Sequence, residues 1–156
     1  MILLQHHPKQ GEILFSKDGT PGLAYHLNEK PKKMIPSGGI LRLKVKNKQI
    51  NEDYLTLVLN SLIVHEQVNR DVGGSVILHW RPDQVKQTLI PILSDEKQKE
   101  IVKKITEAFD LRKQSKHLLE CAKSAVEIAI EQNEDAAIKW LQEQTKGYGA
   151  ETCGRS

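Results

Sequence analysis

The amino-acid sequence predicts an α+β protein in which a small β-rich part with helices is followed by a long helix. Residues 11–46 read as short apolar runs between turn-forming residues, and the last run alternates apolar and basic residues from Leu41. A period of two is typical of a half-buried strand. From Asp95 the chain contains no Pro or Gly until Gly147, which favours one long helix. A chain of 156 residues has room for one compact core and an appendage.

Three runs, at residues 12–16, 23–27 and 39–46, predict strands, and a fourth candidate follows the Gly pair at residues 75–80. The turn after the first run holds two glycines that can adopt a positive φ. A helix is expected from Asn51, which can cap an acidic first turn, to about Gln67. These elements form the predicted β-rich domain, residues 1–93.

The second predicted domain, residues 94–144, is helical. A helix from Asp95 to Gln132 would be roughly 57 Å long at 1.5 Å per residue, so it is expected to protrude and to need a partner for its apolar stripe. A break is expected near Asn133, before a final helical piece, and residues 145–156 are expected to form a flexible tail. The stripe has a coiled-coil spacing of three and four, and its members are Ile101, Ile105, Ala108, Leu119, Ala122, Val126 and Ala129.

Charge is unevenly distributed. The net charge is +3, but residues 1–50 carry nine basic and three acidic side chains, and residues 51–156 carry 14 basic and 17 acidic ones. A basic surface attracts phosphates through counterion release. Lysine-rich turns also keep a β-rich surface soluble and its edges unpaired. Charge alone leaves both explanations open.

Several classes of protein are disfavoured. Two cysteines cannot supply the disulfide framework of a small secreted domain, no stretch reaches the ~20 apolar residues of a membrane span, and the first residues lack an export signal. We therefore expect a protein of the reducing cytoplasm that does not contact a membrane. Cys121 is expected to act as a small apolar filler on the long helix.

No catalytic, metal or cofactor site is predicted. His6 and His7 have no further ligand nearby at metal-binding spacing, and no Gly-x-Ser-x-Gly motif marks a hydrolase. The run from Ser16 to Thr20 is similar to the Asp-x-Asp-Gly-Thr loop of haloacid-dehalogenase-type phosphatases. However, Ser16 stands where that family has its nucleophilic acid.

Three segments together resemble the specificity subunits of type I restriction-modification systems. Residues 11–22, GEILFSKDGTPG, are similar to the family's Gly-Asp-Ile-Leu-x-Ser-x-x-Gly-x-x-Gly stretch, with Glu12 in place of Asp. Residues 74–79, GSVILH, resemble its Gly-Ser-x-x-x-His element. Residues 90–93, IPIL, with 98–102, QKEIV, resemble its Ile-Pro-Leu-Pro and Glu-Gln-x-x-Ile segments, and Lys97 replaces the usual Glu. Their order and spacing across residues 11–130 make the combination specific.

The resemblance implies a non-catalytic, DNA-reading target-recognition domain, curved and β-rich, whose partners are double-stranded DNA and the methyltransferase (modification) and restriction subunits. The long helix would pair with a second such helix, either from a second copy or from a half-subunit. Such subunits usually carry two recognition domains, so this chain is expected to be part of one or a half-subunit that dimerises. Our candidates for DNA contacts are Lys17, Thr20, Lys32, Lys33, Lys46, Arg70 and Ser75.

An alternative remains open. The protein would then be a helical scaffold or oligomerisation protein whose β-rich part caps a coiled coil without specific DNA reading.

Overall fold

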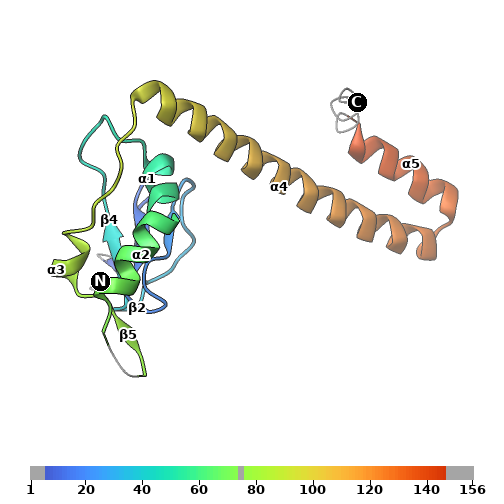
Figure 1. Ribbon diagram of the computed structural model, residues 1–156. Coiled ribbons are helices and arrows are strands. Elements are labelled where there is room, and N and C mark those ends of the chain that lie inside the picture. The colour runs from blue at the N-terminus through green and yellow to red at the C-terminus, as the bar shows by residue number, and fades with distance from the viewer. Residues whose placement is uncertain (1–5, 74–75, 147–156) are drawn as a thin grey trace. The chain divides into compact units, whose positions relative to one another are not determined.

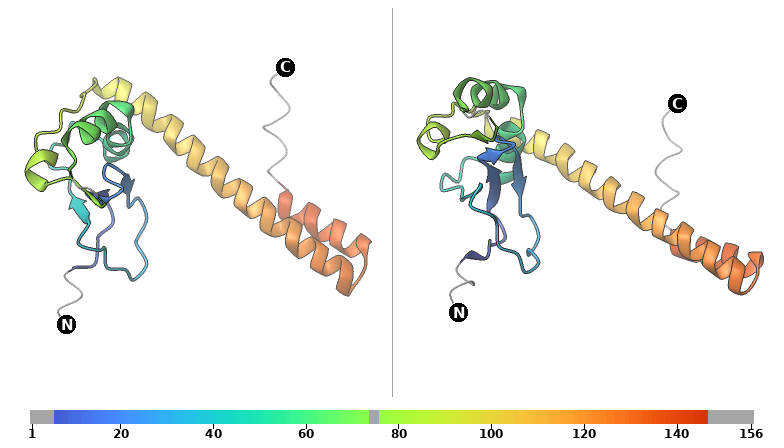
Figure 2. Two further views of the ribbon diagram at one scale, coloured as in Figure 1. Left: turned by 60° about the horizontal axis from the view of Figure 1, so that its bottom comes forward. Right: turned by 90° about the horizontal axis from the view of Figure 1, so that it is seen from below.

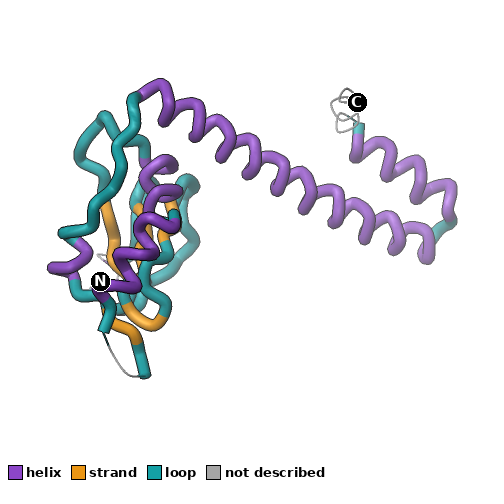
Figure 3. The backbone as a smooth tube through the Cα atoms, in the orientation of Figure 1, coloured by secondary structure: helices purple, strands orange, loops and turns teal. Residues whose placement is uncertain are grey.

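A computed structural model describes residues 6–73 and 76–146 (Figure 1). The chain divides into two compact units, Met1–Val102 and Lys103–Ser156. The first unit combines short strands with helices, as the colours of Figure 3 show, and the second is helical. The predicted α+β class is confirmed.

A three-stranded antiparallel sheet forms the centre of the first unit. Its order is β3 (Ala24–His26), β1 (Ile13–Ser16) and β4 (Ile40–Leu43), and β1 pairs with both neighbours. These strands lie within the three predicted runs but are shorter. Glu12, which directly precedes β1, accepts two hydrogen bonds from the Arg42 guanidinium, at 2.8 and 2.9 Å. The ion pair therefore ties the start of β1 to β4.

The predicted helix from Asn51 to about Gln67 is two helices, α1 (Glu52–Leu59) and α2 (Leu62–Asp71). The prediction of Asn51 as the N-cap is confirmed, since its side chain accepts hydrogen bonds from the N–H groups of Asp53 and Tyr54. The prediction of one uninterrupted helix was wrong.

The break between α1 and α2 falls at Asn60, for a tertiary reason. The Asn60 amide accepts a hydrogen bond from the Ala24 N–H at 3.0 Å and donates one to the Ala24 carbonyl at 2.8 Å. It thereby satisfies both backbone groups of an edge-strand residue, as a neighbouring strand would.

The core lies where α1 and α2 pack against the sheet. Phe15 and Trp80 meet edge to face, with ring centroids 5.6 Å apart. Gly22 has a φ of +91°, and a side chain there would meet Val68 at 2.9 Å, so glycine is required for the close approach of α2. The buried members of the core are Ile13, Phe15, Tyr54, Val58, Leu59, Val64, Val68 and Trp80.

Helix α4 (Asp95–Glu131) ends close to the predicted Gln132, and α5 (Glu134–Thr145) follows the predicted break. Asn133 caps α5 by accepting a hydrogen bond from the Ala136 N–H at 2.9 Å. Both views of Figure 2 show α5 lying beside the last turns of α4. The small residues Cys121 and Ala125 on α4 and Ala137 on α5 are buried, as expected for Cys121. The predicted tail lies outside the described residues from position 147 onward.

Within the described residues, no helix is long and apolar enough to cross a membrane.

Candidate nucleic-acid interface

A second, two-stranded sheet extends from the first unit. Strand β2 (Asp18–Gly19) pairs antiparallel with β5 (Leu78–His79), and Gly73 forms an isolated bridge with His79 (Figure 1). We call residues 17–20, 73 and 76–79 the finger. A strand is predicted over residues 75–80, and among the described residues 76–80 the structure has it at 78–79.

An acidic side chain holds the two strands of the finger together. The Asp18 carboxylate accepts a hydrogen bond from the Lys17 ammonium at 2.7 Å and lies 2.9 Å from Nδ1 of His79. The hydrogen bond from Lys17, and then the one from His79, hold the pKa of Asp18 below its ordinary value. A Cβ atom at Gly39 would lie 3.1 Å from the Asp18 Cβ, so glycine leaves room for this cluster.

The root of the finger is fixed to the core through backbone bonds. The Trp80 N–H donates to the Lys17 carbonyl at 2.8 Å, and the Lys17 N–H donates to the Gly39 carbonyl at 2.8 Å. The Ser16 hydroxyl donates to the Thr20 carbonyl and accepts from the Leu23 N–H. Because Trp80 is buried, the finger is rooted in the core.

The seven predicted DNA contacts fall in different places. Lys17 and Thr20 lie in the finger, and Arg70 lies on α2 three residues before Gly73. Lys32 and Lys33 are exposed in the loop between β3 and β4, and Lys46 is exposed after β4. Ser75 lies outside the described residues. The structure thus brings Lys17 and Thr20 together and leaves the other lysines on two loops, with Lys32 and Lys33 on one and Lys46 on the other.

Two of these cations already have carboxylate partners. Lys17 pairs with Asp18, and the Arg70 guanidinium donates to both carboxylate oxygens of Asp71, at 2.7 and 3.2 Å. The pKa of Asp71 is lowered chiefly by the hydrogen bond from Arg70. Since Arg70 is largely exposed, this pair is weak enough to be exchanged for a phosphate.

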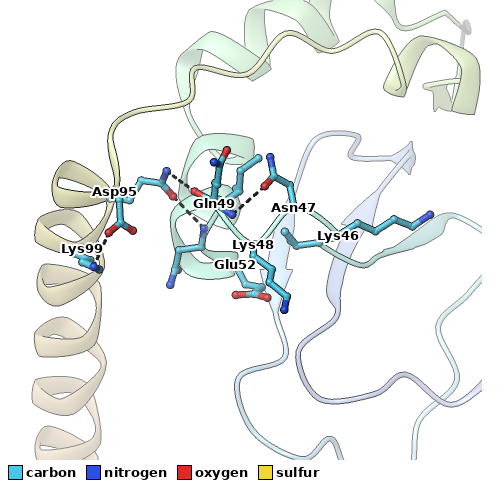
Figure 4. A pocket seen from close by; sticks show the side chains of 11 residues that line it. Lys46, Asn47, Lys48, Gln49, Glu52, Asp95 and Lys99 are labelled. Carbon is cyan, nitrogen blue, oxygen red and sulfur yellow. Dashed lines mark hydrogen bonds and ion pairs between the residues drawn. The ribbon is translucent and has the colours of Figure 1, made fainter.

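A cleft of about 310 Å³ lies between residues 45–52 and the start of α4 (Figure 4). The lysines that line it do not converge, because Lys99 pairs with Asp95 and Lys46 points away from Lys48. The lysines of this cleft are therefore not arranged to bind one phosphate together.

Sequence reasoning missed Gln98, which is buried beside this cleft. Its side chain accepts a hydrogen bond from the Asn51 N–H and donates to the carbonyls of Gln49 and Leu93. A polar residue at the start of a helix gives no sequence signal of burial, and the QKEIV segment includes Gln98 as part of the family resemblance without assigning it a structural role.

The predicted helix-pairing stripe divides between the two units. Ile101 packs against the core of the first unit. In the second unit Ile105 and Ala129 are half-buried, and Ala108, Leu119, Ala122 and Val126 are exposed. The side of α4 that contains Cys121 and Ala125, which is buried, is not the side of the predicted stripe. The pairing of this stripe with another helix stays a prediction.

Among the described residues, no group of three or more His, Cys, Asp or Glu side chains could hold a metal ion.

Comparison with known families gives this arrangement its context. The family described as Type I restriction modification DNA specificity domain matches residues 5–120, about three-quarters of the chain. The chain belongs to this family. The resemblance carried by residues 11–22, 74–79 and 90–102 is thereby confirmed.

A solved structure supports the fold of this specificity domain. The chain is similar to the crystal structure of a type I restriction-modification system S subunit from M. genitalium, with a TM-score of 0.62 and 13% sequence identity. The alignment covers 91% of this chain and 38% of that S subunit, so the chain spans well under half of its length. No curated protein matches the sequence.

Proposed function

We propose that this specificity domain reads duplex DNA for a type I restriction-modification system. The observation that carries the proposal is the match of residues 5–120 to the DNA specificity family. The basic character of residues 1–50 supports it, because localised cations give affinity for the phosphate backbone. The sequence that is read is set by contacts to base edges, which residue types alone do not reveal.

In this proposal the exposed lysines contact phosphates. The loops that flank β4 expose Lys32, Lys33 and Lys46. None of the ion pairs described above involves one of these lysines. Loops on a rigid sheet are common positions for binding residues. Phosphate contacts fix the register of a protein on DNA and carry no sequence information themselves.

The stripe on α4 would hold a partner helix, from a second copy or from a half-subunit. Exposed Leu119 and Val126 support this role, because an apolar stripe at coiled-coil spacing gains free energy when another helix covers it. The domain would position the modification and restriction subunits, and methyl transfer and cleavage would take place in those cytoplasmic partners. The domain itself would be non-catalytic.

A salt titration of DNA binding tests the proposal. Filter binding of a duplex to the full chain with its methyltransferase subunit should weaken steeply as salt rises. The variant Lys32→Gln/Lys33→Gln should lower the slope of log K against log salt by about 0.9 for each phosphate that is no longer neutralised. The matched control Lys113→Gln/Lys116→Gln removes the same charge from α4 and should keep the slope.

Other outcomes would favour the scaffold alternative. Absence of DNA binding with the methyltransferase subunit present contradicts the proposal. If the wild-type protein has no affinity for DNA, and the Lys32→Gln/Lys33→Gln variant still forms the helix complex, helix pairing is the remaining function.

A further inference from the structure

The tip of the finger exposes three consecutive aliphatic side chains. Val76 is 91% exposed, Ile77 54% and Leu78 41%. Isolated apolar residues are normal on a protein surface. Three in a row at the end of a two-stranded sheet lose hydrophobic free energy unless a partner covers them.

The tip is held on a fixed support. The His79 N–H donates to the Gly73 carbonyl at 2.9 Å, and the next residue, Trp80, is buried against Phe15. Lys17 and His79 both bind the Asp18 carboxylate from opposite strands. These contacts hold the segment around β5 in place, and the aliphatic side chains next to it stay exposed.

Two arginines flank the finger in the sequence, one on each side of its base. Arg70 precedes Gly73, and Arg81 follows Trp80. One side chain links the backbone beside Arg70 to that of Arg81: Gln84 donates to the carbonyl of Asp71, the residue after Arg70, at 2.7 Å and accepts from the Arg81 N–H at 3.0 Å. The finger therefore emerges from a base that carries two guanidinium groups.

Both guanidinium groups are available to an anion. The Arg70 side chain is 69% exposed and that of Arg81 is 68% exposed. Their partners, Asp71 and Asp83, come from neighbouring positions in the chain; the Asp71 side chain is 17% exposed and that of Asp83 66%, and ion pairs of such exposed arginines contribute little free energy. Phosphates can replace these carboxylates at small cost, and can bind a guanidinium group in a bidentate manner, as Asp71 binds Arg70.

We propose that the finger enters the major groove of DNA, where Val76 and Ile77 contact thymine methyl groups and Arg70 and Arg81 bind the flanking phosphates. This inference rests on the proposed function and deepens it. A two-stranded ribbon fits the major groove, and the C5-methyl of thymine is the apolar group exposed there. Charge complementarity favours DNA over an apolar protein surface, since two exposed arginines at the base of the finger can bind phosphates of the backbone that borders a groove.

The test compares thymine with uracil, which lacks only the methyl group. The wild-type full chain, with its methyltransferase subunit, first selects its preferred sequence from a duplex pool with a randomised centre. Each thymine of that sequence is then replaced by uracil in turn, and the affinity is measured. We expect about fourfold weaker binding at one or two positions, the value of one buried methyl group.

The variant Val76→Ser/Ile77→Ser should bind the thymine and uracil duplexes equally. Leu89→Ser is the control, because Leu89 is an aliphatic residue of the same unit whose 77% exposure lies between those of Val76 and Ile77, and it should keep the wild-type uracil effect. Thermal unfolding of each variant checks the fold, and exposed side chains predict unchanged midpoints.

The outcomes separate the two proposals. If the wild-type protein selects no sequence, both the proposed function and the proposed role of the finger are overturned. If the wild-type protein selects a sequence but shows the same uracil effects as the double variant, only the proposed role of the finger is overturned. If the double variant still selects the sequence but no longer binds the methyltransferase subunit, the tip contacts a protein. That result would overturn the proposal for the finger.

Discussion

The side chain of Gln98 accepts a hydrogen bond from the backbone N–H of Asn51 at 3.0 Å, which joins the first turns of α4 to the N-cap of α1. Gln98 is only 2% exposed, and its amide also donates to Gln49 and Leu93. All of its hydrogen-bonding atoms therefore have protein partners from two loops. This residue fixes the start of α4 within the first unit.

Replacement of Gln98 by alanine should destabilise the first unit. Three backbone groups would lose their partner in a buried site, so we expect the free energy of unfolding to fall by about 2–3 kcal/mol. Urea unfolding followed by tryptophan fluorescence measures this change, because Trp80 lies in the core of this unit. Gln87→Ala is the control, because Gln87 is exposed in the same unit, and it should change stability by less than about 0.5 kcal/mol. Equal effects of the two substitutions would show that the Gln98 bonds contribute little.

Two neighbouring glycines give a sharper test of the finger. A Cβ atom at Gly39 would lie 3.1 Å from the Asp18 Cβ and 3.3 Å from Oδ2, whereas one at Gly38 would meet nothing within 4 Å. Gly39→Ala should therefore displace Asp18 and cost about 1–2 kcal/mol through overpacking. Gly38→Ala should be neutral or slightly stabilising, since it restricts the unfolded chain.

Denaturant unfolding of both glycine variants measures these costs, and the NMR signal of the His79 ring reports whether its contact with Asp18 persists. A Gly39→Ala protein with wild-type stability and an unchanged His79 signal would contradict the close packing.

Local patterns were sufficient for the elements that depend on the chain nearby. Asn51 caps the helix for which it was proposed, the break falls at the predicted Asn133, and α4 spans the stretch that the absence of Pro and Gly indicated. The break at Asn60 could not be predicted in this way, because its cause is a bond to Ala24, 36 residues away. Hydrogen bonds between distant segments leave no periodicity in the sequence.

The candidate site was harder to predict than the fold. Lys17 and Thr20 were chosen as single turn residues, and the finger that unites them depends on pairing between Asp18 and His79, 61 positions apart. Val76 and Ile77 were predicted as part of a strand, and their exposure could not be predicted because an aliphatic run does not reveal whether a core covers it.

Stability should depend on pH through Glu12. The hydrogen bonds from Arg42 hold the pKa of Glu12 below its usual value of 4.5. A lowered folded-state pKa stabilises the protein fully above pH 4.5, and the effect is lost as pH falls through the folded-state pKa. Glu12→Gln should therefore reduce the free energy of unfolding by about 1–2 kcal/mol at neutral pH and by progressively less in acid.

Urea unfolding at a series of pH values from about 7 downward measures the Glu12 contribution. Glu29→Gln is the control, because Glu29 is exposed in the loop between β3 and β4, and the difference from wild type should stay near zero at all pH values. A constant difference between Glu12→Gln and wild type across this series would show that the Arg42 bond does not cause the effect.

The exposed stripe on α4 predicts a defined response to charge. Leu119 is 57% exposed in the chain by itself, and a partner helix would bury it. Leu119→Glu should weaken the complex tenfold or more, because it removes about 1.5–3 kcal/mol of apolar burial and places a carboxylate in an apolar seam. Light scattering tests pairing with a second copy, and co-purification tests pairing with another subunit. Gln114→Glu adds the same charge to another side of the helix and should leave the complex intact. If both variants lose the complex to the same extent, the contact does not lie on this stripe.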